Sequence, residues 1–375
     1  MLNKEEIVRY SRHLLLPEIG ITGQEMLKNA KVLVIGAGGL GCPVLLYLTA
    51  SGVGEIGVVD FDRVDASNLQ RQVLYTNGDI GKKKVAAAVD KLTMQNPHVE
   101  FISYDFQLTP KNALETIANF DIVIDGTDNF STRYMVNDAC VLLGKPLIYG
   151  AIYRFEGQVS VFNSRDKSGI LGPTYRCLFP KPPDPSSSLN CSATGVLGVL
   201  PGIIGTIQAN EAIKIITGVG EILSGRLLIV NMLTMNFNTI EVSRSSGFAK
   251  SMPESQADFK AVNYDFLCEM HSSSNIKNIS PRELLQLLDE RDKLQILDVR
   301  EAGELPVAEG LVDLQISLSE IPDEVDKISK EKRVVVFCKG GQRSKRAIEF
   351  LQKEHQFSNL YNLEGGIIGL LNENQ

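Results

Sequence analysis

The sequence predicts two α/β domains, a larger one with a doubly wound, mainly parallel sheet and a smaller one after it. Three observations support this fold class. Strand-like and helix-like segments alternate from residue 32 to residue 150, a glycine-rich turn follows the first strand, and a second alternation starts near residue 280. Because parallel strands need helical crossovers, such alternation indicates a parallel sheet with ligands beyond the carboxyl ends of its strands.

The expected elements of the larger domain follow in chain order. Short helices at 5–15 and up to residue 29 precede strands at 32–35, 56–60, 99–103, 121–125 and 147–150, which alternate with helices at 41–51, 81–94, 110–119 and 130–143. The pattern then changes to a strand at 158–162, a proline- and serine-rich loop at 163–190, a buried helix at 195–217 and a strand at 227–231. A loop of that length is usually functional or mobile.

The domain boundaries are predicted from composition. Residues 243–278 are polar and contain serine clusters, so we interpret them as a linker between domain 1–242 and domain 279–375. Ser280 and Pro281 are typical of a helix start. Strands and a helix follow, at 294–299, 334–337 and 342–353.

Composition and charge limit the kinds of partner. Of the 375 residues 43% are hydrophobic and 22% charged, as in ordinary globular proteins. The net charge of −7 argues against nucleic acid, since phosphate binding calls for a basic face. The N-terminus lacks a signal-peptide pattern, and the most apolar segment, 196–207, is too short to cross a bilayer. We therefore expect a cytoplasmic protein without membrane contact.

The glycine-rich turn predicts a nucleotide site. A strand leads into it and an apolar helix follows, so backbone amides at a helix N-terminus can approach phosphate oxygens. The next strand ends at Asp60, about 20 residues after the glycines, where a carboxylate usually holds a ribose hydroxyl. Such a turn serves NAD, FAD and ATP alike, and it can also simply pack a helix onto a sheet. Its glycines are Gly36, Gly38, Gly39 and Gly41.

The residues beyond Asp60 favour ATP with magnesium over a dinucleotide. Cleaving ATP requires cations that stabilise developing charge, whereas hydride transfer does not. We expect Asp128 to hold Mg²⁺, because magnesium sites commonly use one carboxylate. Lys84 by itself would suit a solvated helix start. The polar residues that follow are Asp62, Asn68, Arg71, Lys84 and, after a later strand, Asp128.

Two cysteines are candidate nucleophiles. Cys338 opens a loop between a strand and a helix, so backbone amides would point at its sulfur and stabilise a thiolate or persulfide, with Arg343 beside it. Cys191 lies just before the apolar helix at 195–217, and helix N-termini lower thiol pKa values. The alternatives are a buried structural cysteine and a half-buried loop cysteine. The six cysteines form no CxxC pair, so no zinc site is predicted.

Several motifs resemble known families. An ordered set in residues 5 to about 240 is similar to the MoeB/ThiF family, bacterial relatives of ubiquitin-activating enzymes, and most of all to its molybdopterin-synthase adenylyltransferases: Arg9-Tyr-Ser-Arg12, the glycines of 36–41, Asp60-Phe-Asp62, Ser67-Asn-Leu-Gln-Arg-Gln72, Asp125-Gly-Thr-Asp-Asn-Phe130 and Gln208-Ala-Asn-Glu-Ala-Ile-Lys214. The second domain resembles a single rhodanese domain through Leu297-Asp-Val-Arg-Glu301, Cys338-Lys-Gly-Gly-Gln-Arg-Ser344 and Leu363-Glu-Gly-Gly366.

The resemblance implies a Rossmann-like domain that uses MgATP to adenylate the C-terminal glycine of a small ubiquitin-like sulfur carrier ending in Gly-Gly. A rhodanese persulfide on Cys338, loaded from a cysteine desulfurase or from thiosulfate, would convert the adenylate to a thiocarboxylate. Arg12 matches an arginine supplied by the other subunit of a homodimer, and Cys191 a cysteine proposed to bind the carrier covalently. The ATP-site positions matched are Gly39, Asp60, Asn68, Arg71, Lys84 and Asp128.

The resemblance also leaves alternatives. Molybdopterin (molybdenum cofactor) biosynthesis with a MoaD-like carrier is the expected pathway, but thiamine synthesis with a ThiS-like carrier and tRNA thiolation use the same tail chemistry. A nicotinamide-dependent oxidoreductase and a non-catalytic carrier scaffold are more remote. Many family members bind zinc through two CxxC pairs, whereas here the first reads Thr174-Tyr-Arg-Cys177 and the second is absent from 235–252. We therefore expect a zinc-free protein.

Overall fold

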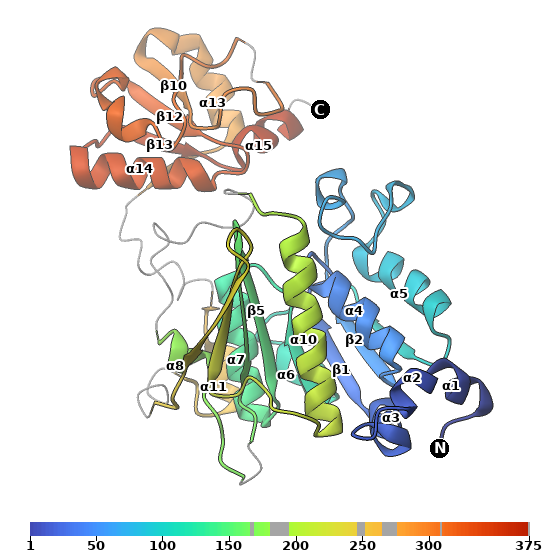
Figure 1. Ribbon diagram of the computed structural model, residues 1–375. Coiled ribbons are helices and arrows are strands. Elements are labelled where there is room, and N and C mark those ends of the chain that lie inside the picture. The colour runs from blue at the N-terminus through green and yellow to red at the C-terminus, as the bar shows by residue number, and fades with distance from the viewer. Residues whose placement is uncertain (166–168, 181–194, 246–251, 265–275, 308–309, 374–375) are drawn as a thin grey trace. The chain divides into compact units, whose positions relative to one another are not determined.

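The computed structural model describes residues 1–165, 169–180, 195–245, 252–264, 276–307 and 310–373. They belong to two compact units, each built around its own sheet (Figure 1). This confirms the predicted fold class of a larger and a smaller α/β domain.

An eight-stranded sheet forms the centre of the first unit. Its order is β3-β2-β1-β4-β5-β6-β7-β8; the first five strands pair in parallel, and the last three add antiparallel. The chain therefore runs outward from β1 in both directions, as the alternation predicted. The strands are β1 (Lys31–Ile35), β2 (Glu55–Val59), β3 (Glu100–Tyr104), β4 (Ile122–Asp125), β5 (Leu147–Tyr153), β6 (Glu156–Phe162), β7 (Arg226–Asn231) and β8 (Asn236–Glu241).

Helices cover both faces of this sheet, which is why β1 is apolar at successive positions. Val32 and Val34 of β1 pack into one core cluster, and Leu33 and Ile35 into the cluster on the opposite face. Figure 1 shows α4 and α10 on one face, and α6 and α7 on the other. A further helix, α5 (Lys84–Gln95), contacts α4. The other helices are α4 (Gly41–Ser51), α10 (Val199–Thr217), α6 (Ala113–Ala118) and α7 (Phe130–Leu143).

The N-terminal region differs from the single helix expected at 5–15. The chain forms α1 (Lys4–Arg9) and α2 (Ser11–Leu14), which meet at the buried Tyr10, and α3 (Gly20–Asn29) follows. The Tyr10 hydroxyl accepts a hydrogen bond of 2.8 Å from the side chain of Asn96. A contact across 86 residues thus fixes the break between the helices.

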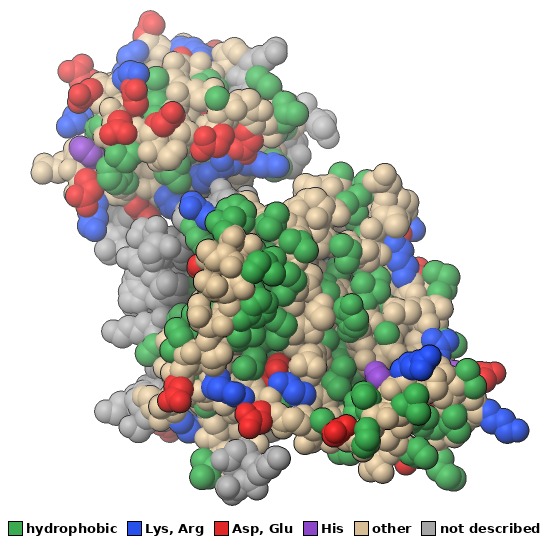
Figure 2. Space-filling model, viewed as in Figure 1, with side chains coloured by type: hydrophobic (Ala, Val, Ile, Leu, Met, Phe, Trp, Pro, Cys, Tyr) green, Lys and Arg blue, Asp and Glu red, His purple; other side chains and the backbone are tan. Residues whose placement is uncertain are grey.

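Strand β8 was not predicted. All six of its residues are exposed, so its sequence lacks the buried positions that mark a strand. It forms because it pairs along the whole length of β7. Phe237 and Ile240 of β8 are among the exposed large hydrophobic residues, and Figure 2 shows hydrophobic side chains gathered on the face of the first unit that carries α10.

Part of the stretch 243–278, expected to be a linker, is folded onto the first unit. It contains α11 (Gln256–Ala261), where Phe259 is fully buried. The hydroxyl of Tyr264 donates a 2.9 Å hydrogen bond to Asp138, which also forms an ion pair with Arg176 of α8 (Tyr175–Leu178). Two aromatic residues therefore anchor a segment that its serine clusters had made look like a linker.

The second unit has a five-stranded sheet in the order β11-β10-β12-β13-β9, with every pairing parallel. Its first helix begins as predicted, because the Ser280 hydroxyl accepts a hydrogen bond from the amide of Glu283, and the Glu283 carboxylate accepts one from the amide of Ser280. The elements are β9 (Lys277–Ile279), α13 (Pro281–Leu287), β10 (Leu294–Asp298), β11 (Leu314–Gln315), β12 (Arg333–Phe337), α14 (Gln342–His355), β13 (Leu360–Leu363) and α15 (Gly366–Glu373).

Candidate active sites

A cleft of about 220 Å³ lies beyond the carboxyl ends of β1, β2 and β4. The sheet brings the predicted glycine turn to the same place as side chains that follow two other strands, as expected for this topology. Its lining includes Gly36, Gly38, Gly39, Asp60, Asp62, Arg71, Lys84 and Asp128. Three other predicted residues lie outside the lining: Gly41, Asn68 and Arg12, the last exposed on α2.

The glycine turn requires glycine for two distinct reasons. Gly36 has a φ of 95°, a conformation that other residues rarely adopt, and its amide donates to the carbonyl of Val59 at 2.8 Å. A Cβ on Gly41 would lie 1.9 Å from the Gly36 carbonyl oxygen. Gly41 therefore allows α4 to begin directly against the turn, which explains its position outside the cleft.

Asp60 connects the end of β2 to the glycine turn. Its carboxylate accepts hydrogen bonds from the amide of Ala37 at 2.8 Å and from the amide of Asp62 at 2.9 Å. Burial raises the pKa of Asp60, and the nearby ammonium group of Lys84 opposes that rise. The carboxylate thus positions the turn and offers a negative group at the edge of the cleft.

Lys84 is a buried cation at the cleft. Its side chain is only 7% exposed, and its Nζ lies 2.9 Å from a carboxylate oxygen of Asp62 and 3.9 Å from one of Asp60. Lys84 is the first residue of α5, although the sequence suggested a start at 81. Because the carboxylates already fix this lysine side chain, binding an anionic ligand costs little additional side-chain entropy.

Arg71 and Asn68 have different surroundings. The guanidinium of Arg71 donates to the carbonyl of Ser67 at 3.1 Å, and its side chain lines the cleft. The side-chain oxygen of Asn68 accepts a hydrogen bond from the amide of Asp65 at 3.3 Å, which closes the short helix at 66–68. In this structure Asn68 therefore shapes the segment that presents Arg71.

The sequence interpretation missed Arg133, a third cation of the cleft beside Arg71 and Lys84. It lies in the first turn of α7, donates to the carbonyl of Thr127 at 2.8 Å, and has its Nε 3.7 Å from the buried carboxylate of Asp125. The Asp125 carbonyl in turn accepts a hydrogen bond from Gln208 at 2.8 Å. Arg133 could have been identified by its position in the sequence, because the first turn of a helix after a parallel strand faces the ligand edge of the sheet.

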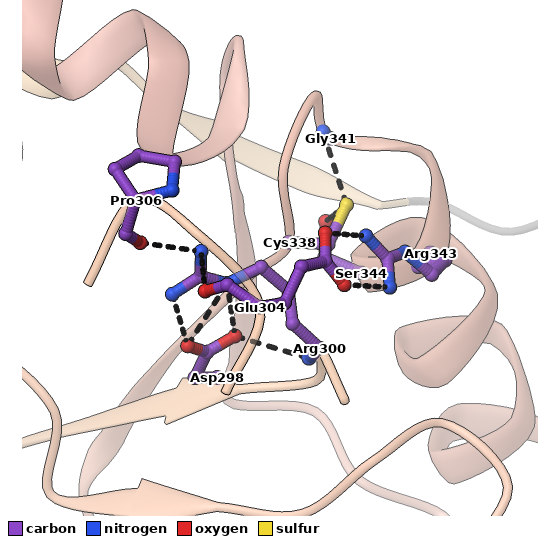
Figure 3. Close-up of polar contacts among 8 residues, drawn as sticks. All are labelled: Asp298, Arg300, Glu304, Pro306, Cys338, Gly341, Arg343 and Ser344. Atoms are coloured by element: carbon purple, nitrogen blue, oxygen red, sulfur yellow. Dashed lines mark hydrogen bonds and ion pairs between the residues drawn. The ribbon is translucent and has the colours of Figure 1, made fainter. Parts of the chain in front are cut away.

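The second candidate site surrounds Cys338, directly after β12 (Figure 3). The cysteine is 2% exposed, and its Sγ accepts a hydrogen bond from the amide of Gly341 at 3.2 Å. The Ser344 hydroxyl lies 3.6 Å from the same sulfur and 2.7 Å from the side-chain oxygen of Asn362. Burial would raise the pKa of Cys338, but hydrogen bonds from Ser344, Gly340 and Gly341 outweigh it and lower the pKa.

Arg343, predicted beside Cys338, is held by an acid that the sequence interpretation did not single out. Its two terminal nitrogens donate to the two carboxylate oxygens of Glu304, at 2.7 and 2.6 Å. The loop that carries Glu304 is fixed by Arg300, which donates to the Pro306 carbonyl at 2.7 Å and pairs with Asp298 at 2.6 Å. Figure 3 shows both pairs next to the cysteine loop.

We expect Ser344→Ala to shift the pH midpoint of Cys338 alkylation by iodoacetamide to higher pH. The hydroxyl helps to hold the thiol pKa below its usual value, and the thiolate, present above that pKa, is the reacting species. Below the midpoint the variant should therefore react more slowly. Mass spectrometry of the Cys338 peptide over a pH series measures this, with Ser319→Ala as the control. An unchanged midpoint would show that backbone amides alone set the pKa.

Other predictions about sites fall partly outside the described residues. Cys191 lies in the segment 181–194, which the structure does not describe. The sulfur of Cys177 accepts a hydrogen bond of 3.4 Å from the Thr174 amide, and within the described ranges no three His, Cys, Asp or Glu residues are grouped to hold a metal. The zinc-free state stays a prediction. Among the residues that the structure describes, no helix combines the length and apolar character needed to cross a membrane.

The fold and the two sites define a two-domain enzyme with a nucleotide-type cleft and a reactive-cysteine loop. The chain belongs to the ThiF family, whose model matches residues 10–248, and a Rhodanese-like domain matches residues 280–373. It is an adenylyltransferase joined to a sulfurtransferase, as its relatives are named.

Two relatives and one solved structure illustrate the comparison. The probable adenylyltransferase/sulfurtransferase MoeZ of Mycobacterium tuberculosis is 43% identical over 98% of this chain and 93% of its own. The sulfur carrier protein adenylyltransferase of Thermus thermophilus is 52% identical over 64% of this chain and 89% of its own. The crystal structure of E. coli MccB with ATP matches 65% of this chain and 73% of its own, with a TM-score of 0.55. Its 24% identity indicates a shared fold only.

Proposed function

We propose that the protein uses MgATP to adenylate the C-terminal glycine of a ubiquitin-like sulfur carrier, and then replaces the adenylate with sulfur from Cys338. The observation that carries this proposal is the pairing, in one chain, of a cleft with buried cations and a cysteine whose pKa is lowered. Activation of a carboxylate and delivery of a sulfur nucleophile are the two halves of one synthesis.

The residues of the cleft fit ATP. Gly36, Gly38 and Gly39 offer a turn without side chains in front of a helix N-terminus, and Arg71 and Lys84 supply positive charge. One buried polar atom at the cleft, the Gln72 side-chain oxygen, has no hydrogen-bond partner among the described residues and can serve a ligand. Asp128 is the residue that would hold Mg²⁺, which would supply further charge neutralisation at the phosphates.

The first step joins the carrier carboxylate to AMP. A carboxylate oxygen of the carrier attacks the α-phosphorus of ATP, the bond to the β-phosphate oxygen breaks, and pyrophosphate leaves with the bonding electrons. Lys84 and Arg71 stabilise the negative charge that develops on the phosphate oxygens. Arg12 of a second subunit would supply a further positive charge to the phosphates, which is the role proposed for the homodimer.

The second step uses a persulfide on Cys338. Its outer sulfur attacks the acyl carbon, AMP leaves with the electrons of the C–O bond, and an acyl disulfide joins the carrier to Cys338. A thiolate, for which Cys191 is the candidate within the chain, then attacks the Cys338 sulfur. The S–S bond breaks, the carrier leaves as a thiocarboxylate, and Cys338 is left in a disulfide that a further thiol reduces.

Pyrophosphate exchange tests the first half. With a carrier ending in Gly-Gly present, the protein should exchange labelled pyrophosphate into ATP, whereas the same carrier without its last glycine should support no exchange. We propose a MoaD-like carrier of molybdopterin synthesis, with the ThiS-like and tRNA-thiolation carriers as the alternatives that the same assay ranks. Binding of NAD but not ATP would overturn the proposal in favour of an oxidoreductase.

A further inference from the structure

Arg343, the cation beside the reactive cysteine, is already paired with a carboxylate of the same domain. Arg343 and Glu304 form a two-point ion pair in which both terminal nitrogens of the guanidinium contact both oxygens of the carboxylate, at 2.7 and 2.6 Å. The two side chains are 16% and 24% exposed. A parallel pair of this kind satisfies the edge of the guanidinium that would otherwise bind an anion.

The carboxylate is held in place by buried structure. Arg300 donates to the carbonyls of Pro306, at 2.7 Å, and Glu304, at 3.3 Å. Arg300 itself is 2% exposed and is locked against Asp298 at the end of β10. Glu304 therefore reaches Arg343 from a backbone that is anchored to the sheet, as Figure 3 shows, rather than from a free surface loop.

The negative charge of Glu304 affects which sulfur donors can approach Cys338. A dianion that approaches the Cys338 sulfur meets a carboxylate where it would need a free guanidinium. We propose that Glu304 is a specificity-determining residue of the sulfur site, which occupies Arg343 and thereby disfavours small anionic sulfur donors such as thiosulfate. The role in sulfur transfer rests on the proposed function. In that loading reaction the Cys338 thiolate attacks the outer sulfur of thiosulfate, the S–S bond breaks, and sulfite leaves with its electrons.

Two alkylating reagents of different charge test the selection without ATP, carrier or sulfur donor. Iodoacetate is an anion and iodoacetamide is neutral, and both react with the same thiolate, so the ratio of their rate constants at Cys338 cancels changes in thiol pKa. In the full-length protein, Glu304→Gln should raise the iodoacetate/iodoacetamide ratio about tenfold, because it removes the competing charge and leaves Arg343 free. Mass spectrometry of the Cys338 peptide gives both rates.

The matched control is Glu301→Gln, which removes the same charge three positions away on the exposed part of the loop and should change the ratio less than about twofold. Glu304→Ala should reproduce the rise seen for Glu304→Gln. An unchanged ratio in both Glu304 variants, or an equal rise in Glu301→Gln, would overturn the proposal. Loss of the cooperative unfolding transition in both Glu304→Gln and Glu304→Ala would also overturn it, since Glu304 would then be needed for folding.

A second arm uses thiosulfate itself. Persulfide loading of Cys338, followed by the mass of its peptide, should reach half-saturation at a lower thiosulfate concentration in Glu304→Gln than in the wild type. A higher concentration would mean that Glu304 holds Arg343 in its productive position, which contradicts the proposal. The alkylation ratio is measured without the carrier, so failure of the carrier reaction would not affect it and would count against the proposed function alone.

Discussion

Replacing Lys84 with methionine should reduce carrier-dependent pyrophosphate exchange by about 10²- to 10³-fold. The Lys84 ammonium is a preorganised charge in the cleft, held 2.9 Å from Asp62. Methionine keeps the length of the side chain but offers no charge to the phosphates. The variant also removes the cation that opposes the raised pKa of Asp60, so the carboxylate will protonate more readily.

The neighbouring lysine provides the control for this experiment. Lys83 contacts Asp105 at 3.2 Å and lies outside the lining of the cleft, so Lys83→Met should change the exchange rate less than about threefold. Thermal unfolding of both variants separates lost activity from lost folding. Near-normal exchange in a folded Lys84→Met protein would remove Lys84 from the proposed mechanism.

Cys338→Ser should abolish sulfur transfer to the carrier while pyrophosphate exchange continues. A serine hydroxyl cannot form a persulfide, and its pKa is far too high for the amides of the loop to hold an anion there. The carrier should therefore be adenylated but gain no sulfur, as judged by its mass. The largest effect is thus expected on one half of the reaction only.

Cys177→Ser is the matched control, because Cys177 is a free cysteine of the first unit away from the cleft lining. It should leave sulfur transfer intact. Sulfur transfer that survives in Cys338→Ser would assign the persulfide to another cysteine, and the rhodanese loop would then have no part in the reaction.

Strands and turns with strong local signals could be predicted from the sequence. The run Val32–Ile35 is buried on both faces and leads into a turn in which Gly36 has a positive φ and Gly41 has no room for a side chain, so its role was evident. Asp60 and Cys338 likewise follow strands directly, and chain topology places such residues at the ligand edge. Local chemistry and fold agreed at these positions.

The contacts that join distant segments could not be predicted. β8 is fully exposed and exists through its pairing with β7, and the boundary at Tyr10 depends on Asn96. Glu304 lies 39 residues from Arg343, and nothing in either local sequence identifies the partner. Pairwise ionic contacts across a fold carry little local pattern, so they became visible only in the structure.

The intact mass of a Gly-Gly carrier, after incubation with the protein, MgATP, a reducing thiol and either excess thiosulfate or a cysteine desulfurase with cysteine, tests the central claim most directly. We predict a gain equal to the replacement of one oxygen by sulfur, dependent on ATP and lost in Cys338→Ser. A carrier that is adenylated but never gains sulfur from thiosulfate or from a cysteine desulfurase would contradict the coupling of the two sites. An unchanged mass with every carrier would contradict both halves of the proposal.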